Sequence, residues 1–183
     1  MYMVITASPN SDGLTAACGR AALRGIERAG KTGGITDLCA EKIQACRVCG
    51  DGWGVCRDEH RCVIDDGLAG IAARLADAEG AVFVTPVYWW QQSERMKYFC
   101  DRLRRCEARK GDESVMSGKM VNLVAAAGGT GNGTVPCLAG MELWCLHMRA
   151  IPFERIGVTR FTREETLISI EKASVALVQA DKP

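Results

Sequence analysis

Short apolar segments alternate with segments of helical periodicity along the chain, and this alternation constrains the fold more than any other feature. Between the apolar segments, hydrophobic and small residues recur at spacings of three and four, as at Cys18, Ala21, Ala22 and Gly25. The order of these units predicts a doubly wound parallel α/β sheet. The runs typical of buried strands are "MYMVIT" (1–6), "GGITDLCA" (33–40), "AVFVT" (81–85), "VNLVAA" (121–126) and "IPFERIGV" (151–158).

Composition and charge limit the classes of protein to consider. The chain has 183 residues, 48% hydrophobic and 25% charged, as expected for one globular domain over residues 1–183. The net charge of +1 gives no electrostatic reason to expect nucleic acid or an anionic membrane as a partner. The first residues are typical of a strand and not of a signal peptide, and no run approaches the ~18 apolar residues of a membrane span. We therefore expect a cytoplasmic protein whose ten cysteines are reduced.

Three unusual loops follow predicted strands, at residues 7–14, 86–92 and 127–136. The carboxyl ends of parallel strands meet at one edge of a doubly wound sheet, so these loops should gather at a ligand site. The first loop, within "SPNSDGLT", offers hydroxyl groups and a helix amino terminus, which suit a phosphate monoester. An ordinary turn and helix cap is the alternative. Neither GxGxxG nor GxxxxGKS/T occurs there, so the dinucleotide fingerprint and the nucleotide P-loop are absent.

The other two loops favour a planar ligand. Tyr88, Trp89 and Trp90 follow one strand and could form a flat wall for a ring system, or a subunit interface, where such residues are also enriched. The third loop, "AAGGTGNGT", has glycines that let the backbone approach a ligand closely. A flexible connector is its alternative interpretation.

A cysteine-rich loop at about residues 44–64 is the sharpest chemical feature. Cys46, Cys49, Cys56 and Cys62 lie within 17 residues, and four thiolates can hold a tetrahedral zinc ion or a cubane iron–sulfur cluster. The second pair is spaced more widely than in zinc ribbons, which favours a cluster over zinc. Structural or free thiols with no metal are the third alternative.

The remaining basic and thiol residues predict less specific roles. Cys18 and Cys100 lie on apolar helix faces and should be core residues. Cys106 has no paired spacing with another cysteine. The basic segment "RLRRCEARK" (102–110) is typical of a solvated helix end, with attraction of a cofactor phosphate as the alternative.

Two stretches carry a family resemblance. "ASPNSDGLT" (7–15) resembles the phosphate loop of the NADPH-dependent FMN reductases. "CRVCGDGWGVCRDEHRCVIDD" (46–66), followed by "ADAEGAVFVTPVYWWQQSERMKYFCDRL" (76–103), is similar to the iron–sulfur flavoprotein branch of that flavodoxin-like superfamily. The resemblance covers about Met3 to Arg105 closely and continues through "VNLVAAAGGTGNG" (121–133).

The resemblance implies a flavodoxin-like fold with a five-stranded parallel sheet in the order 2-1-3-4-5, the cysteine-rich loop inserted after strand 2, and bound FMN. It implies that the FMN phosphate is surrounded by Ser8, Asn10, Gly13, Leu14 and Thr15. The ribityl chain and isoalloxazine would be lined by Pro86, Val87, Tyr88 and Trp89, and the pyrimidine side of the ring by Ala127, Gly128, Gly129 and Thr130. The residues matching the ligands of a 4Fe–4S cluster are Cys46, Cys49, Cys56 and Cys62.

The chain departs from the family pattern at three places that bear on these sites. Asn10 stands where arginine is common, and Leu14 replaces an asparagine. The largest departure is the spacer "GDGWGV" between Cys49 and Cys56, where the iron–sulfur branch usually has two residues. Extra loop length costs little entropy, so four thiolates could still close on one cluster.

The implied function is an FMN-dependent oxidoreductase that takes electrons from NAD(P)H or a ferredoxin-like donor. The expected acceptor is a small molecule such as a quinone, nitro or azo compound, and no residue is required as a general acid or base. The alternatives are a non-enzymatic flavodoxin-like electron carrier and a flavoprotein whose cysteine loop holds structural zinc or no metal. Carriers of this type are usually strongly acidic, which the charge of +1 argues against. A homodimer or homotetramer is expected because such flavoproteins commonly place the isoalloxazine at a subunit interface.

Overall fold

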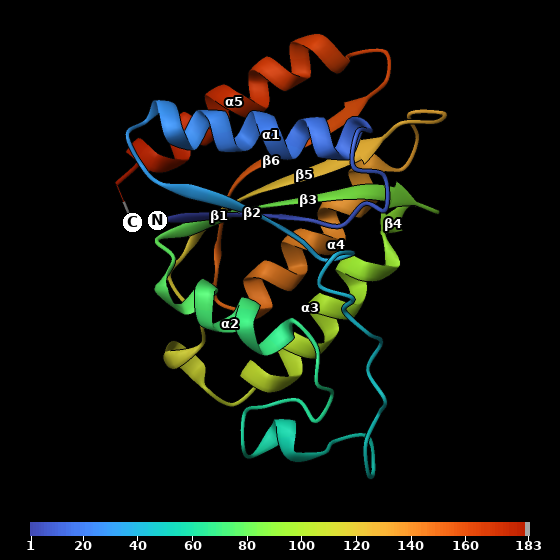
Figure 1. Cartoon of the computed structure of the whole chain (residues 1–183), viewed down its shortest axis with the longest axis vertical. Coiled ribbons are helices and arrows are strands. Elements are labelled where there is room, and N and C mark those ends of the chain that lie inside the picture. The colour runs from blue at the N-terminus through green and yellow to red at the C-terminus, as the bar shows by residue number, and fades with distance from the viewer. Residues whose placement is uncertain (182–183) are drawn as a thin grey trace.

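The computed structural model describes residues 1–181, which form a parallel sheet with helices on both faces (Figure 1). The strands are β1 (Tyr2–Thr6), β2 (Gly33–Asp37), β3 (Gly80–Tyr88), β4 (Gln91–Gln92), β5 (Met120–Ala127) and β6 (Ile151–Thr159). The α-helices are α1 (Leu14–Arg28), α2 (Leu68–Asp77), α3 (Glu94–Glu107), α4 (Thr134–His147) and α5 (Arg163–Gln179). Two short 3₁₀ segments are η1 (Val55–Arg57) and η2 (Gly111–Glu113).

The sheet has the order β2-β1-β3-β5-β6 with all neighbours parallel, and β4 pairs antiparallel with β3 outside this path. The predicted doubly wound parallel α/β sheet is therefore confirmed. The predicted count of five strands is wrong, because residues 1–181 form six. The additional strand lies in "VYWWQQ", which was expected to be a loop.

A tight hairpin explains the sixth strand. Val87 pairs with Gln92 and Tyr88 with Gln91, which leaves a two-residue turn at Trp89 and Trp90. Both tryptophans have positive φ, 48° and 63°, as a type I′ turn requires. Such turns are normally made by asparagine and glycine, so no turn signal in the sequence marked this hairpin.

Strand β3 also continues past Pro86, where the sequence predicted its end. Its ladder with β1 stops at Val84, which pairs with Thr6, while its ladder with β5 continues to the pair Pro86–Ala126. Beyond Val84 one edge of β3 is therefore free of β1. A residue without a backbone N–H is tolerated at such a position.

Side-chain alternation along the strands divides the core into two layers. On one face, Val4, Val82 and Val124 pack with α1 and α5. On the other, a larger cluster that includes Ile5, Phe83 and side chains of α2, α3 and α4 fills the space. Figure 1 shows α1 and α5 together on one side of the sheet and α2, α3 and α4 on the other.

The segment between β2 and α2 contains the cysteine-rich residues and the 3₁₀ turn η1. It extends away from the sheet on the side of α3 (Figure 1). η1 packs against α3. The cysteine-rich segment is thus positioned by a helix and not by the sheet.

Close packing of α1 on α5 depends on Gly25. A Cβ there would lie 2.3 Å from the Glu171 carbonyl oxygen and 2.7 Å from the Ser174 Cβ, so the two helices would have to separate.

We expect Gly25→Ala to lower the free energy of unfolding by about 1–3 kcal/mol in urea titrations, despite the better helix propensity of alanine. Gly70→Ala in α2 is the matched control. Its Cβ would have Arg74 Nη1 as nearest neighbour at 3.6 Å, so it should stabilise by about 0.5–1 kcal/mol. A Gly25→Ala protein as stable as the wild type would contradict this account of the helix contact.

Candidate functional site

The loops after β1, β3 and β5 gather at one edge of the sheet (Figure 1). The three strands are parallel neighbours, so their carboxyl ends coincide. Ser93, which precedes α3, ties two of the ends together: its Oγ donates to the Ala7 carbonyl at 2.8 Å, and its N–H donates to Thr85 Oγ1 at 3.0 Å. All the residues predicted to bind FMN lie in these three segments.

The first loop is shaped by its own side chains. Ser8 Oγ accepts the Asn10 N–H at 3.2 Å, and Asn10 Oδ1 accepts the Asp12 N–H at 3.1 Å. α1 then begins at Leu14 after Gly13, and no side chain among residues 1–181 caps it. Its first-turn N–H groups are consequently available to a ligand, and a helix amino terminus favours an anionic one.

The second loop presents aromatic rings to solvent. The Trp89 side chain is 87% exposed, and its ring centroid lies 5.4 Å from that of Trp90. Tyr88 lines a groove with Pro9 of the first loop. The φ values of both tryptophans are unusual for bulky residues, and strained backbone of this kind clusters at functional sites.

The third loop is joined to the second by a close contact. Gly133 lies against Trp90, where a Cβ would come within 2.5 Å of the indole Cδ1. Ala127 is buried at the end of β5, while Gly128, Gly129 and Thr130 are exposed. The backbone of residues 128–130 is therefore accessible beside the aromatic hairpin, as close approach of a planar ligand requires.

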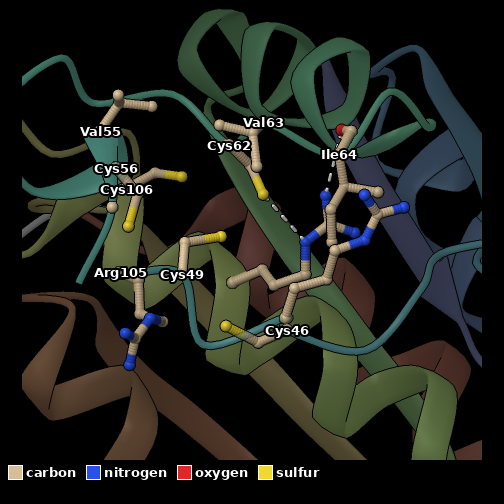
Figure 2. A pocket seen from close by; sticks show the side chains of 12 residues that line it. Cys46, Cys49, Val55, Cys56, Cys62, Val63, Ile64, Arg105 and Cys106 are labelled. Carbon is tan, nitrogen blue, oxygen red and sulfur yellow. Dashed lines mark hydrogen bonds between the residues drawn. The ribbon is translucent and has the colours of Figure 1, made fainter. Parts of the chain in front are cut away.

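A second site lies in the cysteine-rich segment. Cys46, Cys49, Cys56 and Cys62 line one small cavity that is partly open to solvent (Figure 2). The cysteines of residues 1–181 are free thiols. The four residues grouped by sequence spacing are thus brought together in space.

Cys106 of α3 lines the same cavity, and the sequence did not single it out for this role. It is only 6% exposed. Burial, together with the nearby Cys62 and Cys56 thiols, raises the pKa of Cys106 to about 12. In the sequence, the spacing of Cys106 from the arginines of "RLRRCEARK" places it on the same side of a helix as some of them. This spacing points to the cavity only once that helix is known to face the cysteine-rich segment.

Arg102 connects the cavity to the fold. It is 1% exposed and donates from Nε to Cys62 Sγ at 3.3 Å. Its terminal nitrogens bind both carboxylate oxygens of Asp66, at 2.5 and 3.0 Å, and it also donates to the backbone carbonyls of Gln44 and Ile64. The prediction of a solvated helix end is therefore wrong for Arg102, because the cysteine-rich segment folds back over it.

Asp66 is held charged by these contacts. Burial alone would raise its pKa, but hydrogen bonds from Arg102 and from the N–H groups of Gln44 and Leu68 outweigh burial and hold the pKa below its usual value. The bond to Leu68 N–H also places Asp66 at the start of α2. One carboxylate thus anchors both the arginine and the helix.

Arg105 is the second guanidinium at the cavity. It stacks 4.4 Å from the centroid of Trp53, and its Nε and Nη2 atoms are buried with no hydrogen-bond partner among residues 1–181. Arg105 lines the same cavity as the cysteines, and buried donors without a partner favour an anionic acceptor. Within residues 1–181 no group of three or more His, Cys, Asp or Glu side chains could hold a single metal ion.

Comparison with known proteins identifies the family of the chain. The sequence profile of the NADPH-dependent FMN reductase family matches residues 2–160. The chain belongs to this family. The description of the family names FMN and NADPH.

Curated relatives of the chain include iron–sulfur flavoproteins. One from Methanocaldococcus jannaschii is 29% identical over 100 residues, covering 55% of this chain and 50% of the relative. One from Methanosarcina thermophila is 32% identical over 80 residues, covering 42% and 40%. The matched segment thus spans about half or less of each relative's length.

Solved structures with the same fold include oxidoreductases. The NAD(P)H:quinone oxidoreductase from Methanothermobacter marburgensis superposes with a TM-score of 0.76 at 17% identity, covering 96% of this chain and 94% of that one. The azoreductase from Bacillus anthracis gives 0.64 at 16% identity, covering 98% and 99%. At these identities the likeness establishes the flavodoxin-like fold. No helix within residues 1–181 has the length and apolar character needed to cross a bilayer.

Asp66→Asn tests the buried pair. Removing the carboxylate charge leaves Arg102 buried without a counter-charge, and we expect a loss of about 3 kcal/mol in the free energy of unfolding. The wild-type contribution is present above the pKa of the unfolded carboxyl, about 3.9, and is lost as pH falls through the lower folded pKa. The acid-induced loss of stability should therefore be smaller in Asp66→Asn, measured by urea unfolding between pH 3 and 7. The exposed neighbour gives the control, Asp65→Asn, which should behave as the wild type; equal effects of the two changes would refute the assignment.

Proposed function

We propose that the chain is an FMN-dependent oxidoreductase, organised as a single flavodoxin-like domain over residues 1–183. It would pass electrons from NAD(P)H or a ferredoxin-like donor to a small acceptor such as a quinone, nitro or azo compound. The carrying observation is the single sheet edge that combines an uncapped helix terminus, an exposed aromatic hairpin and an accessible glycine-rich backbone. Membership of the FMN reductase family supports the same cofactor.

The residues at this edge would hold and orient the cofactor. The phosphate would bind the first-turn N–H groups of α1 and the side chains of Ser8, Asn10 and Thr15, with Gly13 and Leu14 supplying backbone. Pro86, Val87, Tyr88 and Trp89 would flank the ribityl chain and ring, and Ala127, Gly128, Gly129 and Thr130 the pyrimidine side. Bound FMN supplies hydride and electron transfer, so the protein's part is binding, orientation and exclusion of water.

We also propose that Cys46, Cys49, Cys56 and Cys62 hold a 4Fe–4S cluster that exchanges single electrons with a donor. The shared cavity, the hydrogen bond from Arg102 to Cys62 Sγ and the unpaired donors of Arg105 support this proposal. The names of the curated relatives point the same way. A cluster bound by four thiolates carries net negative charge, which suits the two guanidinium groups at this cavity.

The deciding experiment is anaerobic purification followed by a visible spectrum and quantitation of FMN, iron and acid-labile sulfide. We expect a yellow-brown protein with about one FMN and about four irons per chain, and NAD(P)H oxidation coupled to a quinone. Colourless protein that takes up no added FMN would refute the flavoenzyme. Stoichiometric zinc without iron would refute the cluster. Rapid exchange with a redox protein but no turnover of NAD(P)H or small acceptors would favour the electron carrier.

Asn10→Asp tests the phosphate site. An aspartate keeps the oxygen that accepts the Asp12 N–H but adds a negative charge next to the proposed phosphate. We expect the dissociation constant for FMN to rise at least about tenfold, or about 1.4 kcal/mol. Riboflavin, which lacks the phosphate, serves as the control ligand and should bind both proteins equally. Equal weakening of both ligands, measured by fluorescence quenching, would argue that the loop does not face the phosphate.

We propose in addition that the protein is a homodimer or homotetramer. α4 carries exposed Val135, Leu143 and Leu146 while its other side is buried in the core, and a helix that is apolar all round is normally covered on both sides. The exposed indoles of the hairpin extend the same apolar character. Light scattering should give a mass two or four times that of the chain, and a monomer would contradict the proposal.

A further inference from the structure

The carboxyl end of α3 and the residues just after it contact the cysteine-rich segment at several points. Arg105 and Cys106 follow Arg102 by three and four residues at the carboxyl end of α3, and Arg109 lies two residues past the last helical residue, Glu107. Arg102 binds Cys62 Sγ, Arg105 stacks on Trp53, the Cys106 carbonyl lies 3.0 Å from His60 Nδ1, and Arg109 pairs with Asp58 at 2.9 Å. The segment predicted to be a solvated helix end is thus the support of the cysteine cavity.

Arg105 differs from Arg102 and Arg109 because no carboxylate among residues 1–181 forms an ion pair with it. Arg102 is neutralised by Asp66 and Arg109 by Asp58. The indole of Trp53 stabilises the Arg105 guanidinium through its ring face but cannot accept the in-plane N–H bonds of Nε and Nη2. Buried donors without a partner are costly, so a negatively charged acceptor is expected beside them.

Trp53 belongs to the spacer between Cys49 and Cys56, which is longer here than in the family pattern, and the fold of this spacer brings Trp53 to Arg105. "GDGWGV" turns at Gly50 and Gly52, which have φ of 58° and 95°. Gly54 then packs on Cys49, where a Cβ would approach the Cys49 Cβ to 2.8 Å. The spacer therefore folds back over the cysteines and places its one aromatic ring under the guanidinium.

We propose that Arg105, held by Trp53, is an anion-binding residue of the cysteine cavity that donates hydrogen bonds to the thiolate-bound iron–sulfur centre and raises its reduction potential. The inference rests on the cluster proposed above. Reduction adds one negative charge to the centre, and a nearby cation without a counter-charge stabilises that state. Arg102 contributes less to the potential, because Asp66 offsets its charge.

The test is an anaerobic redox titration of the holoprotein, following the cluster by electron paramagnetic resonance and FMN by its visible absorbance. We expect Arg105→Gln to make reduction of the cluster at least about tenfold less favourable, a fall of about 59 mV for one electron. The FMN potential in the same sample should stay at the wild-type value. The matched control is Arg104→Gln, because Arg104 lines a separate hollow with His147 and should leave both potentials unchanged.

The spacer is tested in the same way. Trp53→Phe keeps a ring face for the guanidinium and should retain the wild-type cluster potential, whereas Trp53→Leu should shift it towards that of Arg105→Gln. If Arg105→Gln fails to assemble a cluster, Arg105→Lys, which keeps the charge, should assemble one, and its failure to do so would overturn the inference.

The outcomes separate this inference from the proposed function. Iron-free wild-type protein would remove the cluster and, with it, this role of Arg105. Wild-type protein with iron and sulfide whose potential is the same in Arg105→Gln would overturn the role of Arg105 and leave the cluster intact. An equal shift in Arg104→Gln would also overturn it, since the effect would then be one of net charge only.

Discussion

The buried ion pair between Arg102 and Asp66 fixes the cysteine-rich segment to α3 and to the start of α2. Its two side chains are 1% and 4% exposed and join α3 to the start of α2. The same guanidinium binds the Gln44 and Ile64 carbonyls and Cys62 Sγ, so both ends of the cysteine-rich segment are tied to one side chain. A buried charge is costly unless it is fully paired. Any other arrangement of these segments would leave the Arg102 or Asp66 charge without its partner.

α3 relates the two candidate sites to each other. Its amino end begins after Ser93, which hydrogen-bonds to the ends of β1 and β3 at the proposed FMN edge. Its carboxyl half carries Arg105 and Cys106 at the cysteine cavity. One helix therefore contacts both the proposed flavin edge and the cysteine cavity.

The departures from the family pattern gain a physical meaning in three dimensions. The spacer between Cys49 and Cys56 is a folded segment whose Trp53 stacks on Arg105, and it still allows the four thiols to share a cavity. The Trp89–Trp90 turn adopts a backbone that bulky residues rarely take, stabilised by the Val87–Gln92 and Tyr88–Gln91 pairs and by the contact with Gly133. In both places local preference yields to tertiary contacts.

The sequence by itself determined the strand and helix order, the parallel sheet and the three loops at its edge, because these follow from local periodicity and from the handedness of βαβ units. It also grouped four cysteines by spacing. Only the tertiary structure decided that β4 exists and that Arg102 is buried. It also decided that Cys106 joins the cavity and that Arg105 Nε and Nη2 have no hydrogen-bond partner within residues 1–181. The hairpin of β4 is local, but its turn residues, Trp89 and Trp90, are not ones that sequence rules associate with such a turn. The features of Arg102, Arg105 and Cys106 depend on contacts between segments some 40–50 residues apart, such as Arg102 with Cys62 and Arg105 with Trp53, and helical or strand periodicity carries no information about such pairs.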